Sequence, residues 1–240
     1  MDKKKDAMGH AIADYWKNGK ADRLRVFSPM FDEDEIPVET LFRSYNEMPI
    51  LEQIAIKQTK GKILDIGAGA GCHSLALQER RMEVCAIDIS PLSVETMKER
   101  GINNVMEGDV FKHQGRYDTI LMLMNGIGIV GSLKNMKSFF ELLDRIMAPD
   151  GQLLCDSSDI AYVFEDEDGN LDLPLADNYY GEMQYRMQYK NVISEPFEWL
   201  YIDAETLKTH ASTYGYHTEV IARGSHHEYL ARITKQRSCK

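Results

Sequence analysis

The chain has 240 residues, with 38 acidic and 28 basic side chains and a formal net charge of −10. Its 43% apolar and 28% charged residues are ordinary for a globular protein and exclude general disorder. The negative charge disfavours nucleic acid as a partner, because it repels phosphate backbones. We find no apolar run long enough for a membrane span and no signal-peptide core. We therefore expect a cytoplasmic protein whose partner is a small molecule, with no nucleic acid and no membrane.

The cysteines do not suggest a metal site. Cys72, Cys85, Cys155 and Cys239 are far apart and form no Cys-x-x-Cys pair. That spacing argues against a zinc site and against a disulfide scaffold, so we expect no bound metal. Cys72 and its neighbour His73 fall in the first turn of an expected helix, where packing or capping is the favoured interpretation.

Residues 1–57 are expected to be helical. Apolar residues recur at spacings of three to four, as in Ile12, Tyr15 and Trp16, which is typical of helices with one buried face. An acidic stretch at residues 31–37 separates the first helices. We interpret the whole segment as a helical cover.

Residues 58–160 alternate between short apolar runs and helix-like segments. Strands alternating with helices of about ten residues predict right-handed βαβ units in a parallel sheet. We expect strands at residues 63–66, 82–88, 104–109, 117–124 and 152–156, the last entered through a turn at Pro149–Asp150–Gly151.

The alternation stops after residue 160. Residues 181–189 alternate strictly between polar and apolar, which predicts an antiparallel strand within an insertion at 161–200. Residues 201–240 are expected to form a helix at 204–214 and a hairpin of strands at 216–223 and 229–234. The prediction is one α/β domain over residues 1–240. It has a Rossmann-like, doubly wound, seven-stranded sheet that is mostly parallel, with an antiparallel C-terminal hairpin, a helical N-terminal cover and an inserted β segment.

The stretch Asp65-Ile66-Gly67-Ala68-Gly69-Ala70-Gly71 is the most informative part of the sequence. Glycines at alternate positions let the backbone turn sharply into a helix and approach a ligand closely. The dinucleotide fingerprint has the form G-x-G-x-x-G/A, whereas Cys72 stands at its third small position here. Asp65 precedes the loop where it would repel a pyrophosphate, so a ligand with a cationic group fits better.

Together with later signals, this stretch resembles the class I S-adenosylmethionine-dependent methyltransferases. Residues 63–71 match that family's first motif in full, and further acidic and proline-glycine motifs follow in order through residue 160. The resemblance implies methyl transfer from S-adenosylmethionine to a small-molecule acceptor by in-line displacement. It implies cofactor binding by Asp65, Gly67, Ala68, Gly69, Gly71, Asp88, Ile89, Asp109, Val110, Met124, Asn125 and, from the cover, Arg43.

The acceptor site is less defined by the sequence. Ligands of open α/β sheets lie outside the carboxyl ends of the strands. That rule points to the polar run after the last expected parallel strand, and the cover adds an aromatic side chain. The expected substrate-binding residues are Tyr45, Asp156, Ser157 and Asp159. Trp199 and Tyr201 are expected to pack in the core, and no catalytic residue stands out.

Three further functions remain open. A nicotinamide-dependent oxidoreductase would also use a glycine-rich loop, although Cys72 and Asp65 argue against it. A non-catalytic cofactor-binding module is the second, and an aminopropyl transferase is the third. Two acidic runs, Asp32–Glu35 and Glu165–Asp168, would favour a neutral or cationic acceptor, such as an amine, if they border the pocket mouth. The competing interpretation is that both runs are solvated loops.

Overall fold

We describe residues 1–165 and 178–236 in a computed structural model of the chain. The helices α1 to α6 are Ala7–Asn18, Ile50–Gln58, Cys72–Glu79, Pro91–Glu99, Met136–Ile146 and Ala204–Thr213. The strands β1 to β12 are Leu24–Phe27, Asp34–Ile36, Lys62–Ile66, Glu83–Asp88, Val105–Glu107, Tyr117–Met122, Met147–Ser158, Glu182–Tyr189, Val192–Ile193, Phe197–Leu200, Tyr216–Arg223 and Glu228–Lys235. Short 3-10 turns, among them Val38–Phe42, Tyr45–Glu47 and Gly126–Val130, connect them.

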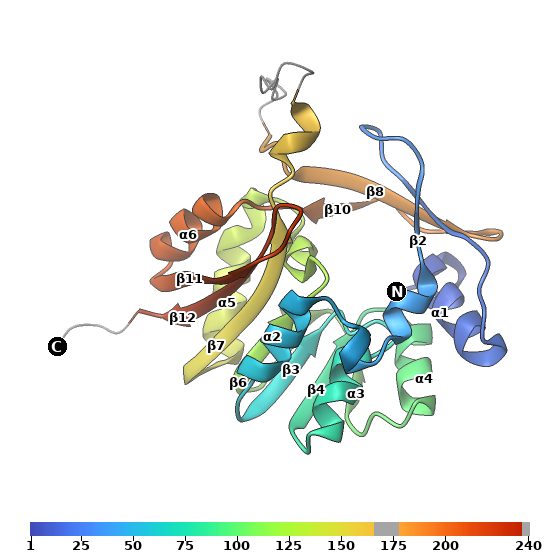
Figure 1. The fold of residues 1–240 in the computed structure, drawn as a ribbon, viewed down its shortest axis with the longest axis horizontal. Coiled ribbons are helices and arrows are strands. Elements are labelled where there is room, and N and C mark those ends of the chain that lie inside the picture. The colour runs from blue at the N-terminus through green and yellow to red at the C-terminus, as the bar shows by residue number, and fades with distance from the viewer. Residues whose placement is uncertain (166–177, 237–240) are drawn as a thin grey trace.

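The main sheet has seven strands in the order β11-β12-β7-β6-β3-β4-β5 (Figure 1). Strands β5, β4, β3, β6 and β7 run parallel, whereas β12 and β11 are antiparallel and close one edge. The order reverses at β3, from which the chain passes outward first through β4 and β5 and then through β6 and β7. This arrangement confirms the predicted Rossmann-like, doubly wound sheet with a C-terminal hairpin.

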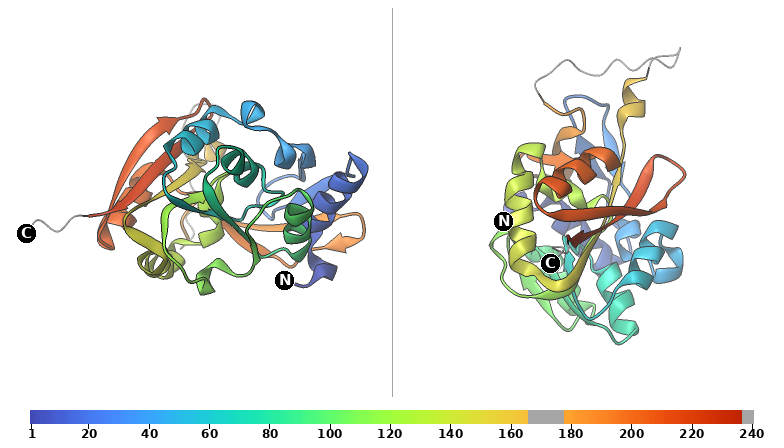
Figure 2. Two further views of the ribbon diagram at one scale, coloured as in Figure 1. Left: turned by 90° about the horizontal axis from the view of Figure 1, so that it is seen from below. Right: turned by 90° about the vertical axis from the view of Figure 1, so that its left-hand side faces the viewer.

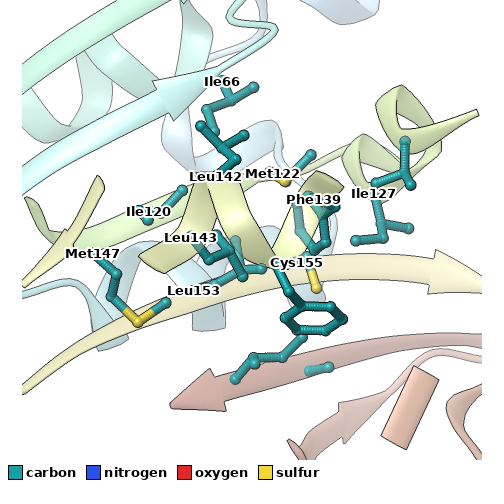
Figure 3. Close-up of a cluster of buried hydrophobic side chains, with 14 of the residues drawn as sticks. Ile66, Ile120, Met122, Ile127, Phe139, Leu142, Leu143, Met147, Leu153 and Cys155 are labelled. Atoms are coloured by element: carbon teal, nitrogen blue, oxygen red, sulfur yellow. The ribbon is translucent and has the colours of Figure 1, made fainter. Parts of the chain in front are cut away.

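Both faces of the main sheet are covered by helices. Side chains alternate along each strand, so Leu64 packs on the α5 and α6 side while Ile63 packs on the α2 and α3 side. The right-hand view of Figure 2 shows α5 on one side of the sheet and α2 and α3 on the other. Figure 3 shows the larger cluster, in which Phe139 and Leu143 of α5 meet Leu153 of β7. Burial on both faces explains why the parallel strands are almost wholly apolar.

A second sheet lies over one end of the first. It has the order β10-β8-β1-β2, with β9 paired to β8, and all its pairings are antiparallel. In Figure 1 it crosses the upper right of the view, apart from the main sheet below it. The predicted strand at 181–189 is confirmed as β8.

The helical cover predicted for residues 1–57 is wrong in part. Leu24–Phe27 and Asp34–Ile36 are strands, because β1 pairs with β8 residues more than 150 positions further along the chain. The predicted turn at residues 149–151 is also wrong, since those residues lie inside β7 at a register shift against β6. No helix in residues 1–165 and 178–236 is both long and apolar enough to cross a membrane.

Candidate active site

A cavity of about 1030 Å³ lies between the two sheets. Its floor comes from the carboxyl ends of the parallel strands, through Ile66 of β3, Asp88 of β4 and Leu123 after β6. Its roof comes from the second sheet, through side chains of β1, β2, β8 and β10. This is where ligands of open α/β sheets bind. The volume is at the upper end of the range for small-ligand pockets, roughly 300–1,000 Å³.

The glycine-rich loop forms one wall of the cavity. Gly67, Gly69 and Gly71 have φ angles of +68°, +57° and +82°, in the region that favours glycine. A side chain at Gly69 would meet only the Gly67 carbonyl oxygen, 4.0 Å away, so the space in front of it is open. Gly71 differs, because a side chain there would collide with Ile102 at 2.2 Å. Gly71 therefore shapes the loop and the start of α3 but does not line the cavity.

Asp88 ends β4 beside this loop. Its carboxylate accepts hydrogen bonds from the backbone N–H groups of Gly69 and Ser90, both at 2.8 Å. Burial raises the pKa of Asp88 to about 6, against the opposing effect of those two hydrogen bonds. Further along the cavity, the Asp109 carboxylate accepts from the Phe111 N–H at 3.0 Å, and Val110 lies behind it. Ile89 projects from the end of β4 and is 48% exposed.

Buried charges surround the first turn of α3. Asp65 is 1% exposed and accepts a hydrogen bond from the Ser74 hydroxyl at 2.7 Å, and burial raises its pKa. His73 contacts Glu52 of α2 at 2.7 Å, and Glu52 also binds Arg43. Burial opposes a charge on His73, but contacts with Cys72, Glu52 and Asp65 outweigh it and raise its pKa well above the usual value. His73 therefore lines the cavity as a member of this buried cluster of ionisable groups.

The chain bends sharply after β6. Met124 and Asn125 have φ angles of +62° and +56°, which are uncommon for residues other than glycine. The Asp156 carboxylate holds this bend by accepting from the Asn125 N–H at 2.8 Å, and burial raises the pKa of Asp156 to about 7. The bend presents Met124 and Asn125 to the cavity.

Most of the predicted cofactor residues meet in this cavity, although their roles stay predictions. The lining includes Asp65, Gly67, Ala68, Gly69, Asp88, Ile89, Asp109, Val110, Met124 and Asn125. Arg43 does not line it, since its guanidinium pairs with Glu52. The predicted acceptor residues Tyr45, Asp156, Ser157 and Asp159 do not line it either.

Those four acceptor residues have structural partners instead. Tyr45 lies against Arg80, with the guanidinium 3.8 Å from the ring centre. The buried Ser157 hydroxyl accepts from the Ile202 N–H at 3.0 Å, and the Asp159 carboxylate accepts from the Tyr180 hydroxyl at 2.7 Å.

The second sheet supplies cavity residues that the sequence reasoning missed. Trp199 and Tyr201, expected in the core, both line the cavity, as do Tyr185 and Phe197. The alternation in residues 181–189 did place Tyr185 on one face of a strand. No local sequence pattern indicated that this face would lie across the cavity from the glycine-rich loop.

Comparisons with known proteins agree with this geometry. A family model described as a methyltransferase domain matches residues 39–219. A crystal structure of an S-adenosylmethionine-dependent methyltransferase from Bacteroides fragilis, in complex with S-adenosyl-L-homocysteine, is 53% identical. It covers 99% of this chain and 98% of its own, with a TM-score of 0.94.

Curated relatives match more distantly. Ribosomal RNA small subunit methyltransferase C from Salmonella arizonae is 31% identical over 125 residues, which are 43% of this chain and 36% of that protein. The putative methyltransferase YqeM from Bacillus subtilis is 28% identical over 117 residues, 45% of this chain and 47% of its own. The matches span less than half the length of these two relatives. Because the family model matches most of its length, the chain belongs to the class I S-adenosylmethionine-dependent methyltransferases.

Proposed function

We propose that this chain transfers a methyl group from S-adenosylmethionine to a small-molecule acceptor. The observation that carries the proposal is the continuous cavity of about 1030 Å³ that joins the glycine-rich loop to the aromatic face of the second sheet. The half of the cavity beside the glycine-rich loop offers carboxylates and backbone groups that suit a nucleoside. The half beside the second sheet offers a separate aromatic surface for an acceptor. A roof over both halves keeps the site narrow, which suits a small molecule.

The cofactor-binding half fits S-adenosylmethionine. The open space in front of Gly69 admits a ligand against the backbone, and the Asp88 carboxylate beside it can accept hydrogen bonds from ribose hydroxyls. Asp109 and Val110 line the same half of the cavity, and we assign the adenine ring to them from the resemblance to the family. We assign the carboxylate of the methionine part to His73 and its ammonium group to the buried Asp65, since both side chains line this half of the cavity.

When bound, the cofactor supplies a methyl group on a positively charged sulfur, which is already a good leaving group. The chain then has to orient the acceptor and exclude water. Positioning of this kind contributes up to roughly 7–11 kcal/mol in favourable cases. In this proposal the glycine-rich loop and the strand ends hold the cofactor, and strands β8 and β10 hold the acceptor. The proposal assigns no general base.

Ribosomal RNA is the competing acceptor, because most of the curated relatives are named as ribosomal RNA methyltransferases. A site for RNA needs cations that neutralise phosphates. No lysine or arginine is among the described residues found to line the cavity, and the whole chain carries a net charge of −10. These charges favour the small-molecule acceptor over RNA.

A transfer assay with methyl-labelled cofactor tests the proposal. The protein is incubated in parallel with a small-metabolite extract and with ribosomal small subunits, and labelled products are identified by mass. We expect label in a small molecule only. The Asp88→Ala variant serves as the control for background. Label in the RNA, or in neither sample, would contradict the proposal.

A further inference from the structure

The second sheet and the residue that follows it present four aromatic side chains to the cavity. Tyr185 of β8 lies directly across from Phe197 of β10, with ring centres 6.2 Å apart. Trp199 meets Phe197 edge to face at the same separation, and Tyr201 accepts a hydrogen bond from the Tyr185 hydroxyl at 3.4 Å. We name these four residues the aromatic wall. Their π faces are electron-rich and attract cations.

Trp199 is held in place from below. A side-chain carbon at Gly128 would lie 2.1 Å from the Trp199 indole nitrogen, so the ring packs directly on the backbone of the turn after β6. That turn also carries Asn125, which lines the cavity. The aromatic wall is therefore fixed against the turn after β6, and that turn borders the cofactor-binding half of the cavity.

Two carboxylates line the same cavity as the aromatic wall. Asp32 and Asp34 line the cavity at its solvent-exposed edge, and they form no ion pair within the part of the chain that the structure describes. Glu33, by contrast, is paired with Arg25. Burial, the hydrogen bond with Tyr201 and the negative charge of Asp34 together raise the pKa of Tyr185, so the charge of Asp34 reaches the aromatic wall.

The floor adds an acceptor that lacks a donor. The Asn125 side-chain oxygen is buried and has no hydrogen-bond partner among the described residues, while its amide nitrogen donates to the Leu200 carbonyl at 3.4 Å. A buried unpaired acceptor is costly unless a ligand supplies an N–H or O–H group. The aromatic faces and the carboxylates of this cavity favour a cation, and the unpaired Asn125 oxygen favours a ligand that also carries an N–H or O–H donor.

We propose that the methyl acceptor is an organic amine, whose cationic nitrogen binds between the aromatic wall and Asp34 and whose N–H group donates to Asn125. This inference rests on the proposed function and names its substrate class. The ammonium form releases one proton to water, and the nitrogen lone pair then forms the new carbon–nitrogen bond. The methyl carbon–sulfur bond breaks with its electron pair left on sulfur. An anionic acceptor would find no lysine or arginine in the described lining.

A non-reactive cation tests binding apart from catalysis. Benzyltrimethylammonium has no lone pair to methylate, so calorimetric titration into protein saturated with S-adenosyl-L-homocysteine reports recognition only. We expect it to bind about tenfold or more tightly than phenylacetate or benzyl alcohol, the scale of a desolvated cation–π contact. Binding of S-adenosyl-L-homocysteine itself, measured first, tests the cofactor half separately.

Matched variants locate the binding site. Asp34→Asn should weaken benzyltrimethylammonium binding several-fold, as expected for loss of a solvent-exposed charge partner. Glu35→Gln removes the same charge from the next residue, which pairs with Arg23 and does not line the cavity, and should change little. Trp199→Leu should weaken binding several-fold. Trp16→Leu, a change in a 41% exposed tryptophan of α1, should not.

The outcomes separate the two proposals. Cation binding that falls in Asp34→Asn and Trp199→Leu but not in their controls supports the amine acceptor. A protein that binds S-adenosyl-L-homocysteine but binds phenylacetate as tightly as the cation overturns the inference and leaves the methyltransferase proposal standing. Equal effects of Asp34→Asn and Glu35→Gln overturn it as well. Failure to bind S-adenosyl-L-homocysteine at all overturns the proposed function.

Discussion

Single residues could be placed from the sequence wherever their surroundings were local. Asp88 ends β4, the parallel neighbour of the strand that leads into the glycine-rich loop, and the motif order was enough to bring both to one cavity. Arg43 shows the limit of that reasoning. Its partner Glu52 lies on α2 within the same N-terminal segment, and the sequence pattern did not show that the two side chains meet, so the ion pair that occupies Arg43 was not foreseen. The same holds for His73, which contacts that buried glutamate at 2.7 Å.

Loss of the Asp88 carboxylate should weaken cofactor binding. In Asp88→Ala a charged acceptor is lost and the Gly69 N–H loses its partner, a change worth roughly 1.5–3 kcal/mol. We expect S-adenosylmethionine affinity to fall about tenfold or more by calorimetric titration, with the circular dichroism spectrum unchanged. Unchanged affinity would remove Asp88 from the cofactor site.

Cofactor affinity should also depend on pH through Asp88. Its pKa in the free protein is raised to about 6, so below that pH the side chain takes up a proton and one of its oxygens stops accepting. Binding that needs the carboxylate therefore weakens as pH falls below 6, by up to about tenfold per unit. Titration of S-adenosyl-L-homocysteine from pH 5 to pH 8 measures this slope. Asp88→Asn should flatten it, and an equally steep slope in that variant would assign the effect to another group.

Whole elements were predictable where their pairing is local or both faces are buried. Strands β3, β4 and β6 are apolar runs bounded by glycine or polar residues, and each was found near its predicted position. Strand β2, by contrast, has the sequence Asp-Glu-Ile, which has little intrinsic preference for a strand. It forms because β1 offers it a partner, and β1 in turn pairs with β8. Such long-range pairing leaves no local pattern, so the roof of the cavity could not be predicted.

The glycine-rich loop gives a prediction at the scale of the element. Gly69→Val should abolish cofactor binding, because the new side chain enters the open space in front of the loop. A left-handed backbone also costs a residue other than glycine about 1–2 kcal/mol. Gly19→Val is the matched control, since Gly19 has φ +69° and an open surrounding but ends α1 away from the cavity.

Both variants should lose similar stability in thermal unfolding, and only Gly69→Val should lose binding of S-adenosyl-L-homocysteine. If Gly69→Val binds normally, the loop is only a turn. If Gly19→Val also fails to bind, the loss reflects the fold and not contact with the ligand.

At the scale of the molecule, the sequence predicted the sign of the charge and one of the places where it meets the cavity. Of the two acidic runs expected at the pocket mouth, Asp32–Asp34 does line the cavity, because β2 brings it onto the second sheet. Within the other run, Asp166, Glu167 and Asp168 lie outside the described residues, and Glu165 does not line the cavity. We call Asp32–Asp34 the acidic rim of the cavity. The net charge of −10 and this acidic rim both attract an approaching cation.

A cationic acceptor should therefore be drawn to the cavity by a field that salt screens. Clefts lined by one sign of charge raise the local concentration of opposite charges, and the screening length is near 10 Å at about 0.1 M salt. We expect kcat/KM for an amine acceptor to fall as ionic strength rises past that value. Replacing Asp32 and Asp34 by asparagine should lower kcat/KM at low salt and reduce its salt dependence. A neutral acceptor should show neither effect, because it carries no charge for the field to act on. Efficiency toward the amine that rises with salt, or that ignores both substitutions, would mean that the rim keeps the protein in solution without guiding its substrate.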